Sequence, residues 1–223
     1  MMLMQPELLE HELHRSRVYR ILADAFRPPA PELENALIRL GDHLTMLESE
    51  ACNTAAGLPE AFTSAGGMEP LKVDYSRLFV GPFLLPAPPY GSVYLESRRR
   101  IMGDSTMDVL EHYREMGMAM AETFKDAPDH VSAELEFMHA LVCRQAEALR
   151  TEDGDGLLDS LHRQHSFLRY HLGAWIPDFT AKVMEHAETR FYRLLGEITK
   201  RFIEEEKDAL GTQVVERTTH AAF

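Results

Sequence analysis

The sequence contains few cysteines and no long hydrophobic run. Only Cys52 and Cys143 occur among the 223 residues, too few for a disulfide framework or a zinc site built from cysteines. Nowhere do about eighteen apolar residues follow one another, which excludes a transmembrane helix. The N-terminal residues lack both a basic stretch and a long apolar run, so they do not resemble an export signal. We therefore expect a soluble protein in the reducing cytoplasm, without membrane insertion.

Basic residues are scarce relative to acidic ones. The sequence has 23 lysines and arginines and 36 aspartates and glutamates, which gives a net charge of −13. Such a surface repels the phosphates of nucleic acids and anionic lipids, so the charge disfavours both as partners. A basic partner fits this charge, although an acidic surface also serves solubility alone. Phosphate-binding and dinucleotide-binding glycine motifs are missing, as is the Gly-x-Ser-x-Gly turn of serine hydrolases.

Strand-like alternation of apolar and polar residues is also missing, whereas helical spacing recurs along the chain. The clearest helix follows Pro31, and its apolar face repeats every three or four residues through Leu33, Leu37, Leu40, Leu44 and Leu47. Other helices are predicted over 7–26, from Ser105 as N-cap, over 131–150 and 157–172, and over 178–206 with a break near 185–189.

These helices predict an all-α fold. We expect one helical-bundle domain of roughly eight to ten helices over residues 1–207, since each amphipathic face needs a partner helix. Residues 208–223 are expected to form a flexible C-terminal tail.

The segment Tyr75–Tyr94 departs most from a generic helical sequence. Its initial helical spacing ends at Gly81-Pro82, and the later prolines keep the backbone extended. It also carries apolar side chains that a solvated loop rarely holds, namely Phe83, Leu84, Leu85, Tyr90 and Tyr94. The segment is either a connector packed on the core or a partly open apolar surface.

Pro128, Asp129 and His130 precede the helix predicted to start at Val131. A carboxylate at this position is stabilised by the free N–H groups and the helix dipole, so Asp129 is explained as a cap. Alternatively, Asp129 points outward and receives an arginine of a partner in bidentate geometry. In that case His130 would titrate near neutral pH and modulate the contact.

A metal site is a further alternative. Glu136 and His139, like Asp159 and His162, are three residues apart, which places a carboxylate and an imidazole on one helical face as in di-iron bundles. Those bundles need two Glu-x-x-His pairs and two more glutamates, and the second pair here begins with the shorter acid. A helical-bundle metal protein or enzyme using these four residues is therefore an alternative, and a structural adaptor without ligands is a third.

Three motifs in order resemble one protein family. Tyr75-x-x-Leu-Phe-x-Gly-Pro82, then Pro88-Pro-Tyr-x-Ser-Val-Tyr94, and then Pro128-Asp-His-x-x-x-Glu-Leu135 resemble the TorD/DmsD family of redox-enzyme maturation chaperones, the wider group that includes NarJ. The resemblance extends over most of the chain, from Leu9 to Glu206. The DmsD-like branch often carries a tryptophan before the Leu-Phe pair, whereas the single tryptophan here is Trp175.

The resemblance implies an all-helical chaperone that has no enzymatic activity and no cofactor. Such chaperones bind the twin-arginine leader, and sometimes the apo form, of a molybdopterin-containing oxidoreductase subunit, and they delay export until the cofactor is inserted. By match to the family motifs, the peptide-binding residues are Tyr75, Leu78, Phe79, Pro89, Tyr90, Ser92, Tyr94, Pro128, Asp129 and His130. The client enzyme stays open, as does the choice between a monomer and a swapped homodimer with hinges near residues 126 and 153–156.

Overall fold

The computed structural model describes residues 5–64, 66–82, 84–96 and 101–221, with side chains between residues 6 and 213. Within these ranges every regular element is a helix, which confirms the all-α prediction. The elements are α1 (Gln5–Ala25), α2 (Leu33–Met46), α3 (Cys52–Ala55), α4 (Leu58–Thr63), α5 (Met68–Tyr75), the π-helical turn η1 (Ser76–Val80), α6 (Gly91–Leu95), α7 (Asp104–Glu115), α8 (Val131–Arg150), α9 (Gly154–Tyr170), α10 (Leu172–His186) and α11 (Arg190–Ala221).

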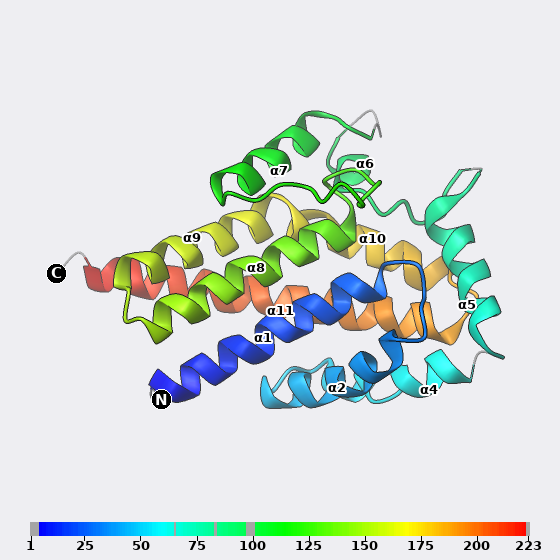
Figure 1. The fold of residues 1–223 in the computed structure, drawn as a ribbon, viewed down its shortest axis with the longest axis horizontal. Coiled ribbons are helices and arrows are strands. Elements are labelled where there is room, and N and C mark those ends of the chain that lie inside the picture. Colours follow the sequence, from blue (N-terminus) through cyan, green and yellow to red (C-terminus); the bar gives the residue numbers. More distant parts are fainter. Residues whose placement is uncertain (1–4, 65, 83, 97–100, 222–223) are drawn as a thin grey trace.

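Five long helices form the body of the molecule (Figure 1). Helix α1 packs along α8, α8 along α9, and α11 against both α9 and α10. Their shared core is rich in fully buried aromatic rings, each contributing about 1.5–3 kcal/mol through burial: Tyr19, Phe26, Phe167, Trp175, Phe179, Phe191 and Tyr192. Helices α2 to α5 flank one end of this body, and α6 and α7 lie above α8 to α10.

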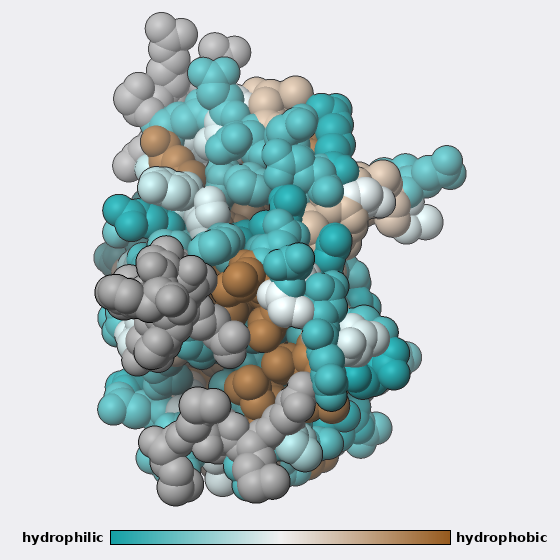
Figure 2. Space-filling model, turned by 90° about the vertical axis from the view of Figure 1, so that its left-hand side faces the viewer, coloured by the Kyte–Doolittle hydropathy of each residue, from teal (hydrophilic) through white to brown (hydrophobic). Residues whose placement is uncertain are grey.

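Both ends of the chain lie at the opposite end of the bundle (Figure 1). Figure 2 shows hydrophobic side chains gathered on this end between hydrophilic ones. The half-buried Leu8 and Leu9 of α1 and Leu157 and Leu158 of α9 belong to helix termini on this side. Among the described residues, no helix has the length and apolar character needed to cross a bilayer.

Two predicted helix boundaries are confirmed. Helix α5 continues into η1 and ends at Gly81, whose φ of 86° is readily adopted only by glycine. Residues 187–189 separate α10 from α11, within the predicted break. The carboxylate of Asp74 holds this break, since its Oδ2 accepts from the backbone N–H groups of Glu188 at 3.0 Å and Thr189 at 2.7 Å.

The predicted N-cap at Ser105 is wrong. Helix α7 begins one residue earlier, at Asp104, and its N-cap residue Gly103 makes no side-chain cap. The backbone N–H and the hydroxyl of Ser105 both donate to Glu96 Oε1, at 3.0 and 2.6 Å. The capping acceptor therefore comes from the end of α6, which local sequence patterns do not reveal.

The proline in α10 is accommodated by a distant lysine. The Trp175-Ile-Pro177 segment, which falls between the helices predicted over 157–172 and 178–206, lies inside α10, and the break between helices is at His171. Pro177 has no N–H to donate to the carbonyl of Gly173 four residues earlier. Lys207 Nζ on α11 donates to that carbonyl at 2.8 Å instead.

The C-terminal residues differ from the expected flexible tail. Helix α11 continues to Ala221, and Leu210 is buried in the core. The tail prediction missed this continuation because the apolar spacing weakens after residue 206. The division of the chain at residue 207 stays a prediction.

Candidate functional site

The second and third sequence motifs lie side by side. An isolated antiparallel bridge pairs Tyr90 with His130. Gly91 N donates to the carbonyl of Asp129, and Val131 N donates to the carbonyl of Pro89, both at 2.9 Å. Two backbone hydrogen bonds thus join segments that the sequence separates by about forty residues. We call the place where Pro89–Gly91 meets Asp129–Val131 the junction.

Asp129 lies beneath this junction and does not point outward. Its side chain is 1% exposed, and Oδ2 accepts from the backbone N–H of Ser92 at 2.8 Å. The expectation of an outward carboxylate that receives a partner's arginine is therefore wrong for this conformation. Asp129 does cap a helix, but the helix is α6 and not α8. The N-cap of α8 is His130, whose Nδ1 accepts from the backbone N–H of Ser132 at 3.1 Å.

His130 is buried as well. Burial lowers the pKa of His130 to about 4, against the smaller opposing effects of Asp126 and Asp129. The expected titration near neutral pH is therefore wrong. Because Nδ1 accepts from Ser132 N, the neutral ring carries its proton on Nε2.

A glutamate and the single tryptophan support the junction from below. Glu134 is fully buried, and its Oε2 accepts from Trp175 Nε1 at 3.0 Å. Burial raises the pKa of the Glu134 carboxyl well above its ordinary value, against the opposing effect of the hydrogen bond from Trp175. Tyr94 stacks on the Trp175 indole with ring centroids 5.5 Å apart. The sequence motif contains Glu134, but its contact with Trp175 was not predicted, because the two residues are 41 positions apart in the sequence.

The first motif forms core rather than surface. Tyr75, Leu78 and Phe79 are 7%, 0% and 3% exposed. Phe79 packs against the rings of Phe26 and Tyr192, at 6.1 and 5.5 Å. These three predicted peptide-binding residues are therefore almost entirely buried and belong to the core of the bundle.

The remaining predicted site residues divide by exposure. Pro89, Ser92 and Pro128 are buried, whereas Tyr90 and Tyr94 are partly exposed. In the same segment Leu84 is 97% exposed, and Phe83 lies outside the described residues. Tyr90 and Tyr94 are thus the predicted site residues that a ligand can reach without rearrangement.

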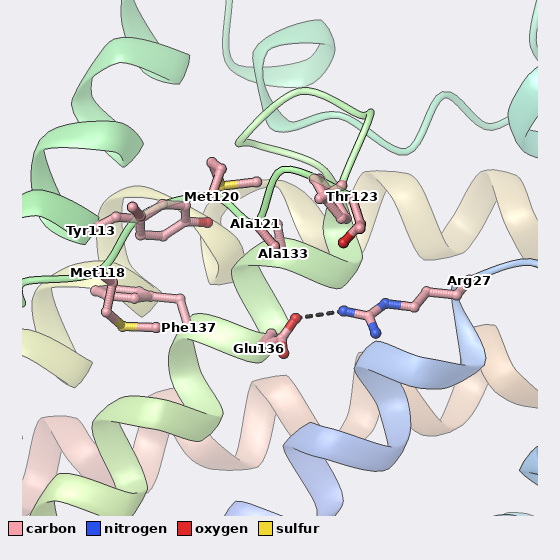
Figure 3. A pocket seen from close by; sticks show the side chains of 11 residues that line it. Arg27, Tyr113, Met118, Met120, Ala121, Thr123, Ala133, Glu136 and Phe137 are labelled. Atoms are coloured by element: carbon pink, nitrogen blue, oxygen red, sulfur yellow. Dashed lines mark hydrogen bonds and ion pairs between the residues drawn. The ribbon is translucent and has the colours of Figure 1, made fainter.

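An open pocket of about 450 Å³ lies beside the junction. It is bounded by α7, α8 and the loop of residues 116–130 (Figure 3). Most of its lining is apolar and comes from Tyr113, Met118, Met120, Phe124, Ala133 and Phe137. None of these residues is among the predicted site residues, because the pocket exists only where three segments converge.

The pocket is tied to the third motif. Tyr113 Oη donates to the carbonyl of Pro128 at 2.9 Å, and the ring of Phe124 lies 6.0 Å from that of His130. The Pro128–His130 segment therefore fixes two walls of the pocket. The Pro128–His130 segment can therefore affect a ligand in the pocket through the positions of Tyr113 and Phe124.

Charged groups form the other side of the pocket. Glu136 accepts from Arg20 Nη1 at 2.7 Å and from Arg27 Nη2 at 2.5 Å, the latter pair visible in Figure 3.

On the loop, Asp126 is exposed and accepts from Tyr90 Oη at 2.9 Å. Asp126, and not Asp129, is thus the carboxylate at the junction that faces solvent.

The residues of the metal-protein alternative do not converge. Glu136 is engaged by two arginines, and Asp159 pairs with Arg163 at 2.9 Å. His139 Nδ1 lies 2.9 Å from the carbonyl of Ser16. In the described part of the chain these residues form no group able to hold an ion.

Comparisons with known proteins connect this architecture to named relatives. The Tat proofreading chaperone DmsD of Salmonella typhi is 32% identical over 132 residues, 59% of this chain and 58% of that protein. The chain thus matches less than two thirds of that relative's length. The perchlorate reductase assembly chaperone protein of Dechloromonas aromatica is 29% identical over 214 residues, 89% of this chain and 90% of that protein. TorD of Shewanella loihica is 26% identical over 216 residues, 88% and 93% of the two chains.

A solved structure shares the fold. The crystal structure of a putative redox enzyme maturation protein from Archaeoglobus fulgidus gives a TM-score of 0.51 at 21% identity, over 86% of this chain and 93% of that one. The family described as nitrate reductase delta subunit matches residues 31–181, well over half of the chain. The resemblance seen in the three motifs is confirmed: the chain belongs to this family, alongside the TorD and DmsD maturation chaperones.

Proposed function

We propose that this protein is a cytoplasmic chaperone for an exported redox enzyme. It binds the twin-arginine leader, the apo form, or both, of a molybdopterin-containing oxidoreductase subunit, assists cofactor insertion and delays export. Relatives named as Tat proofreading and reductase assembly chaperones support this class of function. The observation that carries the proposal is the open apolar pocket fixed to the Pro128–His130 motif.

The apolar wall supplies most of the binding energy. A twin-arginine leader offers an apolar stretch beside its arginines. Burial of about 500 Å² of apolar leader surface contributes about 12 kcal/mol before ordering and association costs are subtracted. Met118 and Met120 suit this task, since methionine adapts its shape to different apolar side chains.

Charge sets the orientation of the bound leader. An exposed ion pair contributes only about 0.2–1 kcal/mol. We assign the arginine-binding role to Asp126, which is exposed beside Tyr90 and has acceptor capacity left after the hydrogen bond from Tyr90 Oη. The charge of Glu136 is offset by Arg20 and Arg27, and Asp129 acts by holding the junction in place. The direct peptide-binding role predicted for the buried motif residues stays a prediction.

Replacement of Met120 by aspartate tests the pocket. The new carboxylate stands in the apolar wall, so we expect Met120→Asp to weaken binding of a synthetic twin-arginine leader at least tenfold in calorimetry, about 1.4 kcal/mol. The matched control is Met107→Asp, because Met107 is 50% exposed on α7 and does not line the pocket. Equal leader affinity for both variants, with circular dichroism showing intact helices, would contradict the assignment of this pocket.

A further inference from the structure

A group of metal-ligating side chains lies away from the candidate site. Asp108 and His112 are one helical turn apart on α7, and His171 occupies the junction between α9 and α10. One ligand atom from each of the three residues lies within 4.8 Å of the others. The group differs from the four residues of the metal-protein alternative.

His171 is the buried member of the group. Its side chain is 3% exposed, and neither Nδ1 nor Nε2 makes a hydrogen bond within the described structure. Nε2 lies 3.1 Å from Asp108 Oδ2, close enough for an ion pair when the ring is protonated, whereas Nδ1 has no such contact. A buried polar atom left unpaired is unfavourable, and coordination of an ion by the ring would offset this penalty.

The ring of His171 is also held in position. It stacks on Phe167 with centroids 5.1 Å apart, and the ring of His112 meets it edge-on at 5.0 Å. Asp108 is exposed at the rim of the group, whereas His112 is half-buried and His171 is buried. The geometry therefore combines two nitrogen donors packed against aromatic rings with one exposed oxygen donor.

We propose that Asp108, His112 and His171 bind one divalent transition-metal ion of the zinc type. Two imidazoles and one carboxylate form a donor set suited to Zn²⁺, with a fourth position open to water. Mg²⁺ and Ca²⁺ prefer oxygen ligands, so this donor set discriminates against them.

The ion would connect α7 to His171, the residue that separates α9 from α10. His112 is followed by Tyr113, whose ring lines the pocket and whose hydroxyl holds Pro128. Metal binding would thus brace the α7 wall of the pocket against the bundle. The role is structural and is independent of which ligand the pocket takes.

A second histidine pair provides a control. His14 Nδ1 and His43 Nδ1 lie 3.0 Å apart between α1 and α2, but no third ligand joins them within the described residues. A His43→Gln variant removes one of these two imidazoles and leaves the proposed site complete.

Zinc titration of the full-length, chelator-washed protein tests the proposal. With excess Mg²⁺ present, we expect one Zn²⁺ per chain in calorimetry. Asp108→Asn and His112→Gln should each weaken binding at least about tenfold, as loss of a metal-site group does, whereas His43→Gln should not. Both informative positions lie at the surface or rim, so the test does not depend on a variant of the buried His171.

Thermal unfolding gives a second readout. Zn²⁺ at one fixed concentration should raise the Tm of the wild type and of His43→Gln equally, and raise the Tm of His112→Gln by clearly less. Absence of stoichiometric zinc binding, or its full retention in Asp108→Asn and His112→Gln, would overturn the proposal. Loss of binding in His43→Gln alone would overturn it as well, because the ion would then belong to the other pair.

Discussion

Individual buried polar residues hold the candidate site together. Asp129 illustrates this at the scale of one side chain, since its Oδ2 holds the Ser92 N–H at 2.8 Å and thereby the start of α6. The carboxylate stands 37 residues away from its partner in sequence. Its effect on ligand binding is therefore expected to pass through the position of α6.

Truncation of Asp129 should destabilise the fold. Asp129→Ala leaves the buried Ser92 N–H without its acceptor, and we expect the free energy of unfolding to fall by about 1–3 kcal/mol in urea denaturation. The exposed Asp126 offers the control, because Asp126→Ala should stay within about 0.5 kcal/mol of wild type. Equal stability of the two variants would show that Asp129 is not a structural anchor.

His130 should make stability depend on pH. Its pKa is lowered from an ordinary 6.5 to about 4 by burial, with Arg27 acting in the same direction and Asp126 and Asp129 against it. Between these values the unfolded chain binds more protons than the folded one, so stability falls as the pH is lowered through this window, by up to about 3 kcal/mol.

A His130→Asn variant isolates this effect. Asparagine can still cap α8 but does not titrate. Urea unfolding at pH 7 and pH 4.5 should show a larger loss of stability for the wild type than for the variant. The same loss in both proteins would assign the pH dependence to other groups.

At the scale of elements, the close approach of α6 to α10 shapes the junction. A Cβ at Gly91 would stand 2.9 Å from Trp175 Nε1 and 3.1 Å from Glu134 Oε1. Gly91 is the position written x in the motif Tyr-x-Ser-Val-Tyr. This chain requires glycine there, because any side chain would push α6 away from the Trp175 indole.

Gly91→Ala tests this close packing. The added methyl group forces a shift of buried atoms, so we expect a loss of about 1–3 kcal/mol in the free energy of unfolding. Gly41→Ala is a matched control inside α2, where an added Cβ meets nothing within 4 Å, and it should stabilise by up to about 1 kcal/mol. A neutral Gly91→Ala would mean that α6 can move away from α10 without penalty.

At the scale of the whole molecule, a buried ionic network joins the two ends of the sequence. Arg15 on α1 donates to Glu206 Oε2 on α11 at 2.6 Å and to Gln164 Oε1 on α9 at 3.0 Å, and it also pairs with Glu12. Arg15 and Glu12 are 2% and 0% exposed. The network therefore links the first and last helices within the core.

Loss of the central arginine should be severe. Arg15→Met leaves two buried acidic groups without their cation, and we expect about 3–5 kcal/mol of destabilisation in urea denaturation. Arg150→Met, at an exposed pair with Glu147, should leave stability close to wild type. A small effect of Arg15→Met would indicate that water or another cation replaces the guanidinium.

The sequence by itself determined the all-helical class, the main helix faces and the pairing of motifs that marks the family, because helical periodicity and proline or glycine breaks are local properties. Tertiary structure alone decided that Asp129 and Phe79 are buried and that Trp175 and Glu134 support the junction. It also decided that Met118 and Met120 line the pocket and that Asp126 is exposed beside Tyr90. The physical reason is that burial depends on which segments approach one another, and the contacts of Ser92 with Asp129 and of Gly91 with Trp175 arise only when distant helices pack.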